Sequence, residues 1–137
     1  MTIKIEEMLS SEDVAKIEKG LSSYNHEQVG ESQYKKLNVV MREPNGKILG
    51  AVRGETYWGW MFIETLWVDE SVRGKGYGTK LMNIAEDEAR QRGCSNSYLD
   101  TFSFQAKPFY EARGYVVVGE IPEFPAGHSR YFLAKKL

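Results

Sequence analysis

The segment from Val72 to Thr79, Val-Arg-Gly-Lys-Gly-Tyr-Gly-Thr, combines closely spaced glycines with two basic side chains. Such glycines let the backbone turn tightly and direct several N–H groups at one anion, and a helix that follows adds the positive end of its dipole. Arg73 and Lys75 bring positive charge to the same place. The pattern predicts a turn that binds a phosphate group.

One acidic residue lies within an otherwise apolar stretch. Glu64 is the only charge in the run Trp60–Val68, and partial burial of its carboxyl group would raise the pKa toward that of a useful general base. The same residue could instead attract a cationic acceptor, or turn to solvent at a local β-bulge. Asp100, at the end of the next predicted strand, is the alternative base.

Aromatic and imidazole side chains are candidates for binding a substrate. Tyr57, Trp58 and Trp60 precede the apolar run, where they could line an acceptor pocket and contact a cation, or simply pack. His26 and His128 can each titrate near neutrality, although a lone histidine in a polar loop is more often a surface or structural residue.

Composition limits the classes of function. The 137 residues, 42% of them hydrophobic, predict a single domain spanning 1–137. A net charge of -1 and a pI near 6.2 argue against a nucleic-acid partner. No segment resembles a signal peptide or approaches the roughly 20 apolar residues of a membrane span, so a cytoplasmic protein with no membrane partner is expected. The single cysteine, Cys94, offers no metal motif, and no metal is expected.

Hydrophobic periodicity and turn residues predict the elements that position these side chains. Helices are expected from Ser10 or Ser11 to Tyr24 or Asn25, over Gly78–Arg92, and over Ala106–Arg113 with Pro108 in its first turn. Strands are expected over Leu37–Glu43, Ile48–Thr56, Trp60–Val68, Ser97–Thr101, Tyr115–Ile121 and Arg130–Ala134. The first two of these form a hairpin around Asn45-Gly46.

The predicted element order is β-α-β-β-β-α-β-α-β-β, with one strand ahead of the first helix. It implies an α/β fold of the mixed α+β type, in which helices flank a mixed, mostly antiparallel sheet of six or seven strands. Apolar residues at both parities of Trp60–Val68 predict an interior strand covered on both faces.

Two segments and this element order resemble the GNAT superfamily of acyl-CoA-dependent N-acetyltransferases over nearly the whole chain. The segments are Leu66-Trp67-Val68 followed by Arg73-x-x-Gly76-x-Gly78, and Ala106-x-x-Phe109-Tyr110-Glu111-x-x-Gly114-Tyr115. The runs Leu99–Gly119 and Gly127–Phe132 also resemble a group of small bacterial members of unassigned substrate. A Walker-type loop is absent, and Gly74-x-Gly76-x-Gly78 lacks the dinucleotide-binding spacing.

The resemblance implies acetyl-CoA as co-substrate. Backbone groups of Leu66, Trp67 and Val68 would pair with the pantetheine arm like an added strand. The pyrophosphate would be surrounded by the turn, made of Arg73, Gly74, Lys75, Gly76, Tyr77, Gly78 and Thr79. Many members carry an asparagine where this chain has Ser103, which could cap a helix or reach the cofactor as a donor.

The resemblance also implies the reaction. Tyr110 matches the tyrosine that protonates the departing thiolate, and Glu64 would be the base, in direct transfer of an acetyl group to a primary amine of a small molecule. A peptide acceptor stays open. The alternative is a CoA-binding regulatory or sensor module with little transferase activity. A homodimer is possible through the aromatic C-terminal strands.

Overall fold

The computed structural model describes all 137 residues, which divide into two compact units, Met1–Ser32 and Gln33–Leu137. In the first unit, helix α1 (Ser11–Val29) is capped by Ser10, whose hydroxyl accepts a hydrogen bond from the N–H of Asp13 at 3.0 Å. The end predicted near Tyr24 is wrong. The apolar stripe stops there, but the helix continues until Gly30, at φ 81°, ends it.

The strand expected ahead of the first helix does not form. Residues 1–10 contain neither a helix nor a strand. A strand needs a neighbour to satisfy its backbone groups, and residues 1–10 pair with none of the six strands, all of which begin at Lys35 or later. No helix of the structure is long and apolar enough to cross a membrane.

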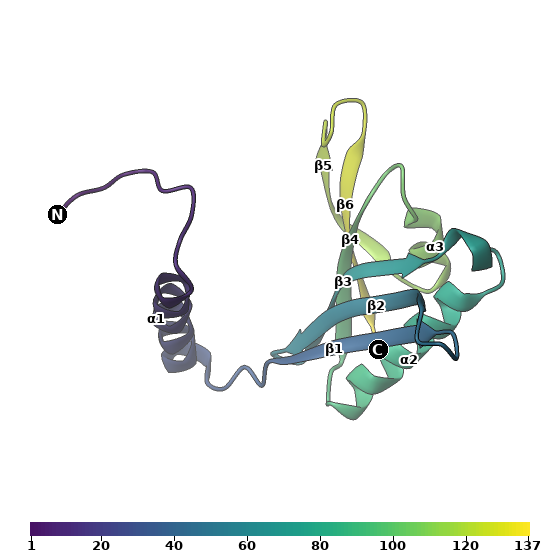
Figure 1. Ribbon diagram of the computed structural model, residues 1–137, viewed down its shortest axis with the longest axis horizontal. Coiled ribbons are helices and arrows are strands. Elements are labelled where there is room, and N and C mark those ends of the chain that lie inside the picture. Colours follow the sequence, from purple (N-terminus) through teal and green to yellow (C-terminus); the bar gives the residue numbers. More distant parts are fainter. The chain divides into compact units, whose positions relative to one another are not determined.

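The second unit holds a six-stranded sheet and two α-helices (Figure 1). Its elements are β1 (Lys35–Arg42), β2 (Ile48–Tyr57), β3 (Trp60–Val68), the 3-10 helix η1 (Glu70–Val72), α2 (Tyr77–Gln91), β4 (Asn96–Phe102), α3 (Lys107–Ala112), β5 (Val116–Pro122) and β6 (Ser129–Lys136). The predicted hairpin is confirmed: Gly46, at φ 91°, turns the chain between β1 and β2.

The strands lie in the order β1-β2-β3-β4-β6-β5, and every neighbouring pair is antiparallel except β3 and β4. The mixed, mostly antiparallel sheet predicted from the sequence is therefore confirmed. In Figure 1, β1 to β3 run across the view, whereas β4, β6 and β5 run up it, so the direction of the sheet changes between β3 and β4.

Helix α2 packs against the first three strands and closes the core. Its buried residues are Leu81, Met82, Ala85, Glu86 and Ala89. All of these except Glu86 belong to one apolar cluster with Leu37, Val52, Met61 and Ile63 from the sheet. Alternate residues of each strand face this cluster, as the period of two requires, so one face of β1 to β3 is fixed against α2.

A β-bulge changes the side on which β3 presents its residues. Arg53 pairs with Thr65 and Gly54 with Ile63, which leaves Glu64 as the extra residue. Ile63 and Leu66 therefore both face the core, whereas Glu64 and Thr65 are exposed. The prediction that β3 is covered on both of its faces is wrong, because Trp67 is 41% exposed. Apolar residues occur at both odd and even positions of β3 because the bulge shifts the alternation by one residue.

Gly54 makes the bulge possible. A Cβ atom at this position would lie 2.1 Å from the carbonyl oxygen of Phe62, which is far inside the contact distance of two heavy atoms. The backbones of β2 and β3 therefore approach so closely here that only glycine fits.

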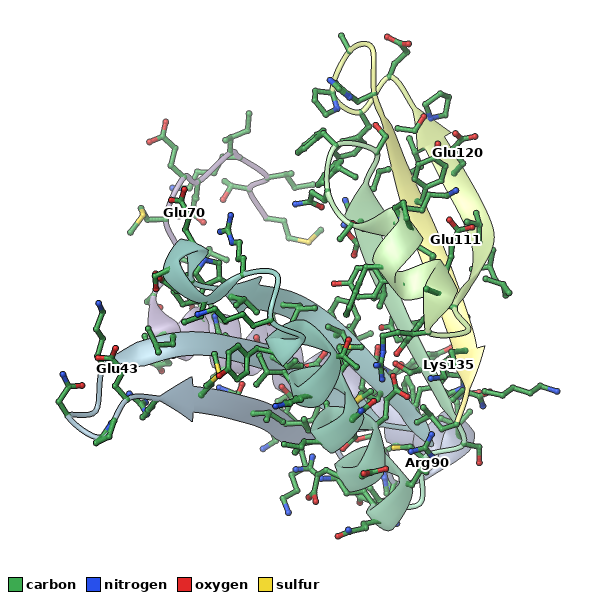
Figure 2. All side chains as sticks on the ribbon, turned by 90° about the vertical axis from the view of Figure 1, so that its right-hand side faces the viewer. Glu43, Glu70, Arg90, Glu111, Glu120 and Lys135 are labelled. Atoms are coloured by element: carbon green, nitrogen blue, oxygen red, sulfur yellow. The ribbon has the colours of Figure 1, made fainter.

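A buried carboxylate joins α2, α3 and β6. The side chain of Glu86 is 3% exposed and accepts hydrogen bonds from Lys135 Nζ at 2.6 Å and Arg113 Nη2 at 2.9 Å. Burial of Glu86 opposes ionisation, but the bonds from Lys135 and Arg113 outweigh it and lower the pKa of its carboxyl group. Arg90 and Lys135, which both contact this carboxylate, can be followed in Figure 2.

We expect Gly54→Ala to destabilise the protein by about 2 kcal/mol or more, because β2 must move away from the carbonyl group of Phe62. Gly119→Ala is the matched control, since Gly119 also lies in a strand and a Cβ there would meet only Phe132 Cβ, at 4.0 Å. Urea unfolding of both variants measures the difference. Equal stabilities would contradict the close approach at Gly54.

We expect Glu86→Gln to lower the free energy of unfolding by about 3 kcal/mol, because Arg113 and Lys135 lose the negative charge that compensates theirs. Asp87→Asn should change it by less than about 0.5 kcal/mol, since Asp87 forms only an exposed ion pair with Arg90. Thermal and urea unfolding check the pair. A change for Glu86→Gln no larger than that for Asp87→Asn would show that the ion pairs of Glu86 with Arg113 and Lys135 do not stabilise the fold.

Candidate active site

The parting of two parallel strands opens a cleft in the sheet. Strands β3 and β4 pair only from Trp60 with Asn96 to Ile63 with Leu99, and then diverge. The cleft that follows has a volume of about 570 Å³. Its lining comprises Ile63, Glu64, Thr65, Leu66, Trp67, Val68, Arg73, Leu99, Asp100, Thr101, Gln105, Ala106 and Tyr110.

One wall of the cleft is the second half of β3. Residues 65–68 pair with β2 on one side only, because the ladder to β4 has ended, and Glu64 before them is the unpaired bulge residue. Their other backbone edge faces the cleft, where it can accept an extended ligand as an added strand. Arg73 closes the far end, since its Nε donates a hydrogen bond to the carbonyl oxygen of Val68 at 2.9 Å.

The glycine turn leads from this wall into α2. Gly74 and Gly76 adopt positive φ angles of 75° and 82°, and nothing lies within 4 Å of a Cβ built on either. Gly76 is the N-cap residue of α2 and has no side chain to bond the first turn, so the N–H groups of that turn remain directed outward. Gly78 packs against α3, because its Cβ position lies 3.6 Å from the ring of Phe109.

The other residues of the glycine turn lie around the first turn of α2. Lys75 and Thr79 are exposed, and Tyr77 is half-buried. The ammonium of Lys80 lies 5.2 Å from the centre of the Tyr77 ring, which adds a further positive charge beside the first turn of α2. The turn is thus positively charged and open to solvent.

The opposite wall of the cleft carries a buried phenol. Tyr110 lies on α3, is 7% exposed, and packs edge-on against the rings of Phe109 and Tyr115. Gln105 positions the start of this helix: its side-chain oxygen accepts hydrogen bonds from Phe102 N at 2.9 Å and Thr101 Oγ1 at 3.3 Å. The phenol is therefore held rigidly across from β3.

Burial, reinforced by the negative charge of Asp100, raises the pKa of Tyr110 to about 12. The hydroxyl group consequently stays protonated throughout the neutral range. It can donate a hydrogen bond, or a proton, to an atom in the cleft that becomes negatively charged.

Glu64 and Asp100 are the two carboxylates of the cleft, and each follows the last paired residue of its strand. The partial burial expected for Glu64 is wrong: the bulge turns its side chain to solvent. Glu64 also borders a smaller recess of about 140 Å³ on β1 and β2. Asp100 instead forms an ion pair with Arg130 of β6 at 2.9 Å.

Several predicted site residues lie outside the cleft lining. The Ser103 hydroxyl bonds Ser129 N at 3.1 Å and lies 3.2 Å from His128 Nδ1, so it ties two loops together. It does not cap α3, whose N-cap residue is Ala106. His26 lies on α1 in the first unit and contacts Glu31 at 3.9 Å.

The aromatic residues predicted to form an acceptor pocket gather where β2 meets β3, at the end of β3 away from the glycine turn. The hydroxyl of Tyr57 is hydrogen-bonded to that of Tyr98. The rings of Trp58 and Trp60 pack beside Tyr57 and Tyr98, with centroids 5.7 and 6.0 Å away. These rings are brought together, but not into the cleft between β3 and β4.

A second groove continues from the glycine turn along α2 and α3. It has a volume of about 570 Å³, and its lining comprises Thr79, Asn83, Glu86, Asp87, Arg90, Phe109, Ala112, Arg113 and Lys135. The Nε atom of Arg113 is buried there without a hydrogen-bond partner. Three basic residues against two acidic ones make this groove net positive.

Comparison with known proteins identifies the family of this chain. Residues 5–115 match the model of the Acetyltransferase (GNAT) family. Because the match covers most of the chain, the protein belongs to the GNAT family and is an acetyltransferase.

Individual proteins similar to this chain are also acetyltransferases. An acetyltransferase of Agrobacterium fabrum is 33% identical over 136 residues, 99% of each chain. A blasticidin-S acetyltransferase of Streptomyces morookaense is 39% identical over 93 residues, 67% of this chain and 68% of the relative. The crystal structure of an acetyltransferase from Agrobacterium tumefaciens superposes with a TM-score of 0.93, at 33% identity and with all of both chains covered.

The raised pKa of Tyr110 predicts a loss of stability in alkali. The unfolded chain releases this proton near its ordinary pKa of 10.0, whereas the folded protein keeps it to about 12, so the free energy of unfolding falls as the pH rises through this interval. The slope is about 1.4 kcal/mol per pH unit for one fully shifted group. Tyr110→Phe should flatten the fall by up to about 2 kcal/mol, measured by urea unfolding between pH 8 and 11.5. If the free energy of unfolding of Tyr110→Phe fell with pH as steeply as that of the wild type, the raised pKa of Tyr110 would be contradicted.

Proposed function

We propose that the protein transfers an acetyl group from acetyl-CoA to a primary amine of a small molecule, by direct attack within a ternary complex. The observation that carries the proposal is the cleft itself. It is lined by an unpaired strand edge and a buried phenol, and it ends at Arg73, the first residue of the positively charged glycine turn. Each of these features suits one part of an acyl-CoA thioester.

The residues present fit the donor. The pantetheine arm needs hydrogen-bonding partners along an extended chain, and the free edge of residues 64–68 offers them. The pyrophosphate needs several N–H donors and positive charge, for which Gly74, Gly76 and the first turn of α2 are placed beside Lys75. Groove residues Asn83, Phe109 and Arg113 are candidates for the nucleotide end, since this groove begins at Thr79.

More distant relatives are consistent with this donor. Two solved acetyltransferases that are 20% and 22% identical to this chain hold acetyl coenzyme A and coenzyme A. At that identity they share only the fold with this protein. The proposal for this chain therefore rests on its own strand edge and glycine turn.

The reaction requires a neutral amine, stabilisation of the carbonyl oxygen and a proton for the leaving thiolate. Acetyl-CoA supplies the thioester. Glu64 takes the proton from the bound ammonium, because it is the carboxylate at the mouth of the cleft that has no cationic partner among the ion pairs. Its exposure suits exchange of that proton with solvent. The nitrogen can then form the new C–N bond.

Two other groups complete the transfer. A backbone N–H on the free edge of β3 donates a hydrogen bond to the carbonyl oxygen as negative charge develops on it. When the C–S bond breaks, Tyr110 gives its proton to the thiolate, and CoA leaves as a thiol. The nitrogen, which carries one proton too many once the C–N bond has formed, returns that proton to the Tyr110 oxygen. The acetylated amine, the thiol, a neutral Tyr110 and one proton on Glu64 then balance the reaction.

The acceptor is best described as a small molecule that carries an amine. The relative named for blasticidin S supports such an acceptor. Support also comes from the volume of the cleft between β3 and β4, about 570 Å³, which is within the range of small-molecule sites. Exposed Glu64 attracts a cation there before it removes the proton.

Release of CoA thiol from acetyl-CoA in the presence of a panel of small amines tests the proposal. With an amine that supports turnover, Tyr110→Phe should lower kcat by about 10² to 10⁴ and leave the calorimetric affinity for CoA unchanged. Tyr131→Phe is the control, because Tyr131 is a half-buried tyrosine outside the cleft lining. Tight CoA binding with no turnover on any amine would favour a CoA-binding regulatory module instead.

A further inference from the structure

The cleft contains two carboxylates, but they differ in their surroundings. Glu64 and Asp100 are the first residues beyond the last pair of β3 and β4, and both line the cleft. Glu64 has no ion-pair partner within 4.0 Å, whereas Asp100 is paired with Arg130. The charge that the cleft presents to an amine therefore depends on how firmly this pair is held.

The guanidinium group of Arg130 is fixed on Asp100. Its Nε and Nη2 atoms both lie 2.9 Å from Oδ1 of Asp100, so two atoms of a planar group contact one oxygen. The register of β4 and β6 dictates this contact. Asp100 faces Phe132 and Phe102 faces Arg130, which makes Asp100 and Arg130 diagonal neighbours on the same face of the sheet.

Three aromatic rings hold the guanidinium group in place. Its central carbon lies 5.6 Å from the ring centroid of Phe102, 5.3 Å from that of Phe124 and 5.2 Å from that of Phe132. The Arg130 side chain is only 30% exposed. Because cation–π contacts favour the charged group where it is, the arginine cannot move away from Asp100 without losing all three.

The smaller recess on the other side of Glu64 does not offer a second site for an ammonium group. The recess beside it is lined by Lys36 and Arg53, together with Glu55. The carboxylate of Glu55 already accepts a hydrogen bond from the Tyr34 hydroxyl at 2.7 Å. Apart from Glu64 itself, which also lines this recess, the border carries two positive charges against one negative charge, so it is unfavourable for a second ammonium group.

We propose that Arg130 determines the charge class of the acceptor: by neutralising Asp100, it leaves Glu64 as the single uncompensated anion of the cleft, so the site selects an acceptor with one ammonium group over a diamine or polyamine. This inference rests on the proposed function, because it assumes that the amine binds at Glu64. Arg130 acts through Asp100 and is therefore a specificity-determining residue, with no part in the bond-making steps.

Removal of the positive charge of Arg130 should expose Asp100 to a second ammonium group. An unpaired carboxylate about 4 Å from an ammonium in a partly solvated cleft raises affinity by about tenfold. Arg130→Met is the suitable substitution, since methionine keeps an unbranched side chain among the three phenylalanine rings. A monoamine, which already uses Glu64, should gain much less.

The test compares 1,4-diaminobutane with butylamine by isothermal titration calorimetry on the full chain saturated with CoA. Arg130→Met should strengthen diamine binding by about tenfold relative to monoamine binding. Arg130→Lys, which keeps the charge, should stay close to the wild type. The double variant Arg130→Met with Asp100→Asn should return to wild-type selectivity, which separates unmasking of Asp100 from general loosening of the loop.

An unchanged ratio of the two affinities in Arg130→Met, a diamine that binds neither protein, or a gain that persists in the double variant would each overturn the inference. Thermal unfolding confirms that each variant is folded. If Arg130→Met does not fold, Asp100→Asn alone decides: a loss of selectivity for the monoamine in that variant would contradict a masked Asp100. The wild-type turnover assay is separate, so the proposed function can stand when the inference fails.

Discussion

Backbone groups at the edge of a strand must find hydrogen-bonding partners, and the second half of β3 has none on the side of β4. The rest of the site depends on this unpaired edge. The bulge at Glu64, made possible by Gly54, redirects the strand just where the ladder ends. The glycine turn follows at its end, and α3 stands opposite, with the ring of Tyr110 packed against Phe109 and Tyr115.

The features that the sequence predicted well are local ones. The Asn45-Gly46 hairpin and the turn at Gly74 and Gly76 need positive φ angles, and glycine at these positions announces them. The helix that follows the turn has a strong apolar stripe, so its span was nearly correct. The end of α1 was missed, because Gly30 rather than the apolar stripe decides it. The strand predicted ahead of α1 is absent, because a strand forms only beside another strand, and hydrophobic periodicity does not show whether such a neighbour is available.

The features that were missed depend on contacts between distant segments. Arg130 reaches Asp100 only through the register of β4 and β6, and Gln105 matters only because the β4–α3 loop folds back on Phe102. Gly54 carried a readable signal, since a glycine inside a strand often marks a bulge or a close backbone approach. It favours an exposed Glu64 at a β-bulge, which was one of the alternatives for this residue, over the partial burial that a catalytic base would need.

Glu86, Arg113 and Lys135 form a buried ionic cluster that fixes three elements of the second unit. It ties α2, which begins at the glycine turn, to α3, which carries Tyr110, and to the end of β6. The loop from Glu123 to His128 contributes nothing to that cluster. Phe124 of that loop contacts the Arg130 guanidinium group, so substitutions in the loop would change the surroundings of the pair that Arg130 forms with Asp100 and leave the contacts of Glu86 intact.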